Sequence, residues 1–184
     1  MSALIAAARR PNFAAEIVLV VCETTGAAGL LVARDAEVNA VLLDFRSFAG
    51  KEAFEAELER QLRAAGVELV CLAGFMRVLT ASFVARWRSR ILNVHPSLLP
   101  DFPGLHTHAR VLEEGRREHG CTVHFVVDEL DAGPIVAQAR VPVFPSDDVS
   151  ALAARVLAEE HRIYPHAVDA IARSLAKRRA AGGA

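Results

Sequence analysis

An amide and an imidazole lie two residues apart in the segment Asn93-Val94-His95-Pro96. If residues 91–94 form a strand, both side chains project from the same side of it. An asparagine N–H can donate to the oxyanion that forms on an attacked carbonyl, and a histidine can carry the proton that an attacking amine loses. The pair therefore indicates acyl transfer. A strand-end asparagine that caps a turn, next to a buried histidine, is the structural alternative.

A carboxylate that could complete this pair is Asp131, in the acidic turn 128–134. Such a turn is by itself a common solvated element, but an aspartate brought against His95 would stabilise the imidazolium. Amide, imidazole and carboxylate would then act together without a nucleophilic side chain. Cys71 lies in an apolar run with no basic residue beside it, so we do not expect it to be a nucleophile.

The other histidines of this region raise the alternative of a metal site: His106, His108, His119 and His124. A His-x-His pair on a strand is a plausible set of ligands. Here the pair follows Gly104 at the start of an expected helix, and no third ligand stands at a fixed spacing. We expect no metal, and we expect these side chains to order the loop through hydrogen bonds.

The composition is typical of a single globular domain. The chain has 184 residues, 53% of them hydrophobic and 23% charged, which suits one globular domain. Its 21 basic and 22 acidic residues leave a net charge of −1, which argues against nucleic acid or anionic lipid as partner. No apolar run reaches the ~20 residues of a membrane span. Cys22, Cys71 and Cys121 are predicted to be reduced core cysteines of a cytoplasmic protein.

Short β-rich runs alternate with helical patterns, which predicts an α/β fold with a mostly parallel twisted sheet and helices on both faces. Asn93 and His95 then stand at the carboxyl end of a strand, where open parallel sheets bind ligands. The proline-rich segment 96–104 is predicted to be a stiff loop, and residues 177–184 a frayed tail. The expected strands are 16–22, 40–44, 67–73, 91–94, 121–127 and 134–143, and the expected helices are 1–10, 26–34, 50–65, 107–117 and 147–176.

Five segments together resemble the phosphoribosylglycinamide formyltransferase family, the folate-dependent enzymes of purine synthesis. They are NVHPSLLP (93–100), PGLHTH (103–108), DELDAGPI (128–135), LAGFMRVL (72–79) and EHRIYP (160–165). The resemblance runs from about Ala3 to Ile171 and implies one formyltransferase domain over residues 1–184. The N-x-H-x-S-L-L-P core is also similar to methionyl-tRNA formyltransferase and formyltetrahydrofolate deformylase. The segment PGLHTH favours the first family.

The resemblance implies a role for each matching residue. Asn93 would bind the formyl oxygen, His95 would transfer the proton, and Asp131 would stabilise the imidazolium and help relay the proton. The co-substrate would be 10-formyltetrahydrofolate, the partners small molecules, and the protein a monomer or homodimer. Glu160 would bind the ribose hydroxyls of the nucleotide. The implied folate-binding residues are Lys51, facing the acidic tail of the folate, and Leu72, Phe75, Met76, Arg77, Val78, Leu79, Val127 and Asp128, around the pterin ring. Core packing is the alternative for Leu72, Phe75 and Met76.

The sequence also departs from the family. Its members begin with an apolar strand and a Gly-x-Gly-Ser-Asn loop that holds the nucleotide phosphate. This sequence starts at the helix that follows that loop, and Leu157 stands where the family tends to carry a polar residue. We expect the strands at 16–22 and 67–73 to face each other without pairing.

Two explanations of this start are open: a chain that begins downstream of its natural start, or a short protein that has lost its affinity for the phosphate. The expected reaction is formyl transfer to glycinamide ribonucleotide. Hydrolysis of the formyl group, another folate-dependent formyl transfer and an inactive chain are the alternatives.

Overall fold

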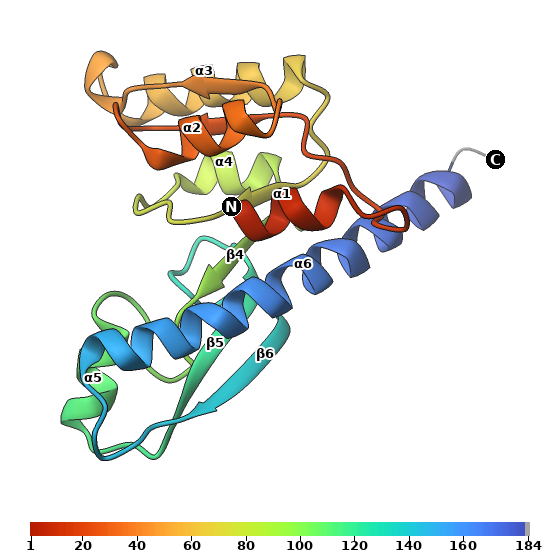
Figure 1. The fold of residues 1–184 in the computed structure, drawn as a ribbon. Helices are drawn as coiled ribbons and strands as arrows, with labels where there is room; N and C mark the ends of the chain where they lie inside the picture. The colour runs from red at the N-terminus through yellow and green to blue at the C-terminus, as the bar shows by residue number, and fades with distance from the viewer. Residues whose placement is uncertain (183–184) are drawn as a thin grey trace.

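The computed structural model describes residues 1–182, and they form an α/β fold (Figure 1). The predicted class is confirmed. The strands are β1 (Val20–Cys22), β2 (Ala40–Leu42), β3 (Val70–Leu72), β4 (Ile91–His95), β5 (Glu118–Phe125) and β6 (Ile135–Pro142). The helices are α1 (Ser2–Ala8), α2 (Ala28–Asp35), α3 (Lys51–Ala64), α4 (Ala81–Arg86), α5 (Thr107–Glu113) and α6 (Val149–Gly182), with a 3-10 turn at Phe45–Ser47.

The strands form two sheets. β1 pairs with β2 in parallel, and the second sheet has the order β3-β4-β5-β6. β3 and β4 are parallel, as predicted, whereas β5 runs antiparallel to both β4 and β6. The short connection between β5 and β6 makes a hairpin, which requires antiparallel strands. β1 and β3 do not pair, in agreement with the expectation for the strands at 16–22 and 67–73.

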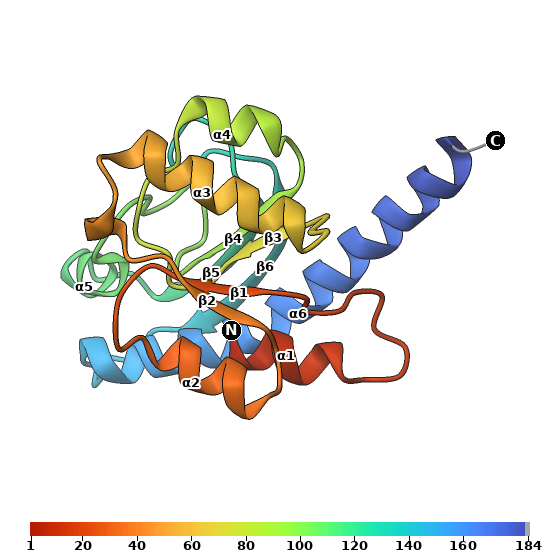
Figure 2. The same cartoon turned by 90° about the horizontal axis from the view of Figure 1, so that it is seen from above.

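Helices cover both faces of the strands (Figure 2). Helices α3 and α4 lie on one face, and α1, α2 and α6 lie on the other. Side chains alternate along β4, so the strand contributes to the hydrophobic core on both of its faces. Ile91 packs with Phe54, Phe83 and Trp87, whereas Leu92 packs in the cluster around α6. Asn93 and His95 continue the Ile91 side of this strand.

Helix α3 shows how closely local sequence sets local structure. Phe54, Leu58 and Leu62, predicted from their spacing of four residues, are all buried. Gly66 ends the helix with φ 66°, a left-handed conformation that glycine adopts without strain. The Gly66 N–H donates to Arg63 O at 3.0 Å and the Val67 N–H to Leu62 O at 2.9 Å. The predicted helix end is confirmed.

The C-terminal helix is longer than predicted. Helix α6 begins after Asp148, whose carboxylate caps it by accepting the Ala151 N–H at 2.7 Å. The prediction of a frayed tail from residue 177 is wrong for residues 177–182, which continue α6. Lysine, arginine and alanine are good helix formers, so nothing local stops the helix there. Residues 183–184 lie outside the described residues.

Candidate active site

Strand pairing places two polar residues of β5 opposite the predicted pair on β4. Asn93 faces His124 in the antiparallel register, and His95 faces Thr122. Directly opposed residues of an antiparallel pair project to the same side, with side chains in contact. His95 is 6% exposed and Asn93 is half-buried. The amide and the imidazole are thus held on a rigid strand.

Both ring nitrogens of His95 face oxygen acceptors. Nε2 lies 2.9 Å from the carbonyl oxygen of Phe102 and donates to it. Nδ1 lies 3.4 Å from Oδ2 of Asp131, an ion-pair distance that is longer than an ordinary hydrogen bond. The His95 and Asp131 side chains are each 7% exposed. If His95 takes up a second proton, at Nδ1, the resulting positive charge therefore lies next to the Asp131 carboxylate, which is shielded from water.

The turn after β5 places Asp131 next to His95. Its backbone takes a left-handed φ of 53°, a conformation that aspartate tolerates better than most residues. Oδ2 accepts the Gly104 N–H at 2.9 Å, and Oδ1 lies 3.7 Å from Nε2 of His124. The structure thus brings Asn93, His95 and Asp131 together from one strand and one turn.

The loop between β4 and α5 is fixed from behind by Thr122. Its hydroxyl donates to Ser97 O at 2.7 Å and accepts the Leu99 N–H at 3.1 Å and a Gln138 N–H at 2.9 Å. The buried hydroxyl uses its full hydrogen-bonding capacity in this network. Residues 96–104 form a loop, as predicted, and these hydrogen bonds hold its first half against β5.

Two of the remaining histidines bond to each other beneath this loop. Nδ1 of His108 lies 3.0 Å from Nε2 of His119. Burial lowers the pKa of both rings, that of His119 to about 4, which favours the neutral form of each. Within residues 1–182, no three His, Cys, Asp or Glu side chains are arranged to hold a metal ion.

A cavity of about 260 Å³ opens between α3 and the segment after β3. Its lining includes six of the predicted folate-binding residues, namely Lys51, Phe75, Met76, Arg77, Val78 and Leu79. Phe45, Phe54 and Glu55 complete the lining and were not predicted. Leu72, Val127 and Asp128 were predicted but are not lining residues; Leu72 packs instead against the core beneath α3.

Side chains anchor the segment that borders this cavity at Arg77 and at Thr80. Nε of Arg77 lies 2.7 Å from Oε2 of Glu23, and its guanidinium stacks 3.6 Å from the centre of the Phe45 ring. The buried carboxylate of Glu55 accepts the Thr80 N–H at 2.7 Å and also the Thr80 hydroxyl. The backbone between these anchors is therefore held in place.

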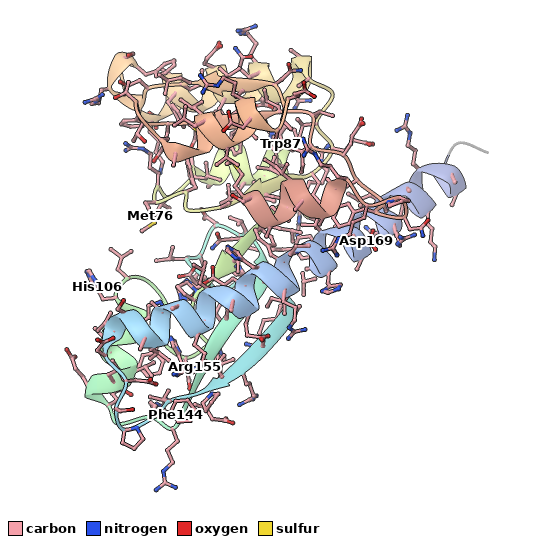
Figure 3. All side chains as sticks on the ribbon, viewed as in Figure 1. Met76, Trp87, His106, Phe144, Arg155 and Asp169 are labelled. Atoms are coloured by element: carbon pink, nitrogen blue, oxygen red, sulfur yellow. The ribbon has the colours of Figure 1, made fainter. Side chains whose placement is uncertain are left out.

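Met76 and Val78 are exposed apolar residues of the cavity lining. Met76 is 71% exposed, and Figure 3 shows it projecting from the same side of the molecule as His106. Val78 and Leu105 are also more than half exposed. Exposed apolar side chains beside a cavity, such as Met76 and Val78, are typical of a ligand-binding surface.

Glu160, predicted to bind the nucleotide, lies on α6 and is not among the lining residues of the cavity. Burial raises its pKa to about 7, opposed by the nearby amino group of Met1. Burial also raises the pKa of Cys71 to about 12, in agreement with the prediction that this thiol is not a nucleophile. No helix within residues 1–182 has the length and apolar character to cross a membrane.

Thr122 and His124 belong to the site but were not predicted as site residues from the sequence. A signal was present: the two stand at alternate positions among the apolar residues of 121–125, so both must project to one face. Their partners on β4 depend on the β4–β5 register, which no local sequence pattern encodes.

Comparison with known proteins gives the family. The sequence pattern described as "Formyl transferase" matches residues 1–168. "Phosphoribosylglycinamide formyltransferase" of Escherichia coli (strain K12) is 44% identical over 165 residues, covering 90% of this chain and 78% of that protein. "Trifunctional purine biosynthetic protein adenosine-3" of Drosophila melanogaster is 48% identical over 154 residues, which are 84% of this chain but only 11% of that protein.

Solved structures that resemble this chain point to the same family as the sequence relatives. The crystal structure of "glycinamide ribonucleotide transformylase 1" from Symbiobacterium toebii superposes with a TM-score of 0.91 at 44% identity, covering 94% of this chain and 82% of that one. "Phosphoribosylglycinamide formyltransferase" from Brucella melitensis gives a TM-score of 0.90 at 49% identity, covering 94% and 88%. With a family pattern over most of its length and relatives this similar in sequence and structure, the chain belongs to the formyl transferase family.

Proposed function

We propose that this chain transfers a formyl group from 10-formyltetrahydrofolate to the amino group of glycinamide ribonucleotide. The observation that carries the proposal is the convergence of Asn93, His95 and Asp131, with the Asp131 carboxylate 3.4 Å from the His95 ring. The names of the Escherichia coli and Brucella melitensis relatives support the choice of substrates.

In this reaction the amine attacks the formyl carbon, a new C–N bond forms, and the bond from that carbon to the folate nitrogen breaks. Asn93 donates an N–H to the oxygen that becomes negative in between. The His95 imidazolium adds a positive charge beside that oxygen. Both groups interact more strongly with the charged tetrahedral state than with the neutral substrates, which lowers the barrier.

One proton must move from the attacking amine to the departing folate nitrogen. His95 carries it through Nδ1, because Nε2 is engaged by the carbonyl of Phe102. Asp131 stabilises the ring while it holds the extra proton. The same carboxylate is anchored by the Gly104 N–H, so it cannot turn away from His95 without losing a hydrogen bond.

The folate would lie in the cavity beside α3. The pterin ring would bind along the anchored backbone of residues 76–79, and Lys51 would meet the acidic tail at the mouth of the cavity. Glu160 would bind the ribose hydroxyls of the nucleotide. The small-molecule substrates agree with a cytoplasmic protein, a setting in which the three unpaired cysteines are ordinary.

The test is an assay of the purified chain with 10-formyltetrahydrofolate, with and without glycinamide ribonucleotide. Production of formylated nucleotide that is lost in Asn93→Ala supports the proposal. Removing one oxyanion donor typically costs ~10²–10³ in rate. Release of formate at the same rate without nucleotide would instead establish hydrolysis. Absence of both reactions would contradict a catalytic role for this chain.

A further inference from the structure

His124 is buried directly against Asn93. It is 2% exposed, and its Nε2 lies 3.3 Å from Nδ2 of Asn93, a hydrogen bond slightly longer than the usual range. The pair is fixed by the sheet register, in which the two residues are direct neighbours across β4 and β5. The proposed reaction uses Asn93 but assigns nothing to His124.

The other ring nitrogen of His124 determines where the ring carries its proton. Nδ1 lies 2.9 Å from the carbonyl oxygen of Phe125, which can only accept. Nδ1 therefore carries the hydrogen, and Nε2 of the neutral ring presents a lone pair. Only the NH₂ end of the Asn93 amide can satisfy that lone pair, so the orientation of the amide is set.

Neutrality of the His124 ring is favoured by its surroundings. Burial lowers its pKa, opposed by the Phe125 carbonyl and by Asp131, and the charge of His95 lowers it further. A protonated ring would present an N–H at Nε2 and would draw the oxygen end of the Asn93 amide towards itself. It would also compete with His95 for Asp131, whose Oδ1 is 3.7 Å away.

We propose that His124 is a positioning residue, which holds the Asn93 carboxamide with one N–H on Nε2 and the second N–H available to the formyl oxygen. The proposal rests on the proposed formyl transfer. A freely turning amide would present its oxygen to the oxyanion in part of the molecules, where it repels instead of stabilising. A fixed donor costs no reorientation when the negative charge develops.

Two variants separate the hydrogen bond from the volume of the ring. His124→Phe keeps a ring of similar size and removes the acceptor, whereas the side-chain oxygen of His124→Gln can still accept the Asn93 N–H. We expect kcat of formyl transfer to fall about 30–100-fold in His124→Phe, with the KM for folate unchanged. This is less than the ~10²–10³-fold cost of removing an oxyanion donor, because the Asn93 amide is misoriented but still present. His124→Gln should stay within about fivefold of the parent protein, as expected if the acceptor alone matters.

A double-mutant cycle with Asn93→Ala tests whether His124 acts through Asn93. In the Asn93→Ala background, His124→Phe should change kcat less than about threefold, since nothing remains to be positioned. A double variant that instead lost kcat by the product of the two single-variant factors would overturn the proposal. So would a His124→Gln variant that is as slow as His124→Phe while melting at the parent temperature.

Nitrogen NMR of the unmodified protein gives a readout that does not depend on activity. The His124 ring should show the neutral Nδ1–H form at pH 7, and one of the two Asn93 side-chain amide protons should shift in His124→Phe. An Nε2–H form or an imidazolium would refute the positioning role. If the parent chain transfers no formyl group but the ring has the expected form, then the proposed function fails and the His124–Asn93 geometry stands.

Discussion

Asp131→Asn removes one negative charge from beside His95 and changes little else. Asparagine tolerates the left-handed φ of 53° at this position. Its side-chain oxygen can still accept the Gly104 N–H, which Asp131 Oδ2 accepts at 2.9 Å. The variant is therefore expected to fold like the parent protein. Alanine would be a poorer probe, because it would add backbone strain and leave the Gly104 N–H without its acceptor.

The size of the effect follows from the distance of 3.4 Å between His95 Nδ1 and Asp131 Oδ2. Two unit charges at that separation attract by about 5 kcal/mol at an effective dielectric constant of about 20. The asparagine dipole keeps part of this stabilisation, so we expect a loss of about 3 kcal/mol in the charged transition state. Since 1.36 kcal/mol corresponds to a factor of ten, kcat should fall by about 100-fold.

The assay is the initial rate of formyl transfer at saturating substrates, together with the melting temperature of each variant. Glu129→Gln is the matched control, because it makes the same charge change in the same turn at an exposed position. We expect the control to retain the parent rate. A kcat for Asp131→Asn within threefold of the parent, at an equal melting temperature, would show that the carboxylate charge does not assist His95.

Three further predictions follow from the pocket and the buried groups. Lys51→Met should raise the KM for a folate with a glutamate tail by about tenfold at unchanged kcat, the result expected for a cation that only binds; equal KM values would count against this contact. The pKa of Glu160 is about 7 in the folded chain against 4.5 for an exposed glutamate, so the folded chain holds the extra proton and loses stability as the pH rises between these values. Melting temperatures from pH 4.5 to 8 should show this loss in the parent and not in Glu160→Gln, and parallel curves would contradict it. Cys121 is fully buried and its pKa is raised to about 12, so a thiol reagent at pH 8 should label it only after unfolding; rapid labelling of the native protein would show otherwise.

The sequence predicted elements whose signals are local. The spacing of Phe54, Leu58 and Leu62 predicts α3, and Gly66 predicts its end, because both depend on residues within a few turns of one another. That Asn93 and His95 project from the same side likewise follows from the alternation of side chains along one strand. Asp131 could be named as a candidate partner from its residue type, but only the resemblance gave it a role, since the turn that carries it is 36 residues further along the chain than His95.

Features that depend on contacts across the fold could not be predicted. The antiparallel β4–β5 register brings His124 to Asn93, and no local pattern encodes a register between separate segments. Phe45 and Glu55 line the cavity because α3 packs over the segment after β3, a tertiary arrangement. The helical residues 177–182 were mistaken for a tail because a basic triplet suits a helix end as well as a helix interior.

The separation of the strands into two sheets has a consequence for amide hydrogen exchange. Within residues 1–182, no strand of the β1–β2 pair bonds to a strand of the larger sheet, and side chains such as Arg77 and Glu23 connect the two parts. β1, β2 and α2 can thus open as one cooperative unit while the ladder from β3 to β6 stays intact, and their amides should take up deuterium sooner than those of β5. Since Phe45, just after β2, lines the cavity, a ligand bound there should slow that uptake.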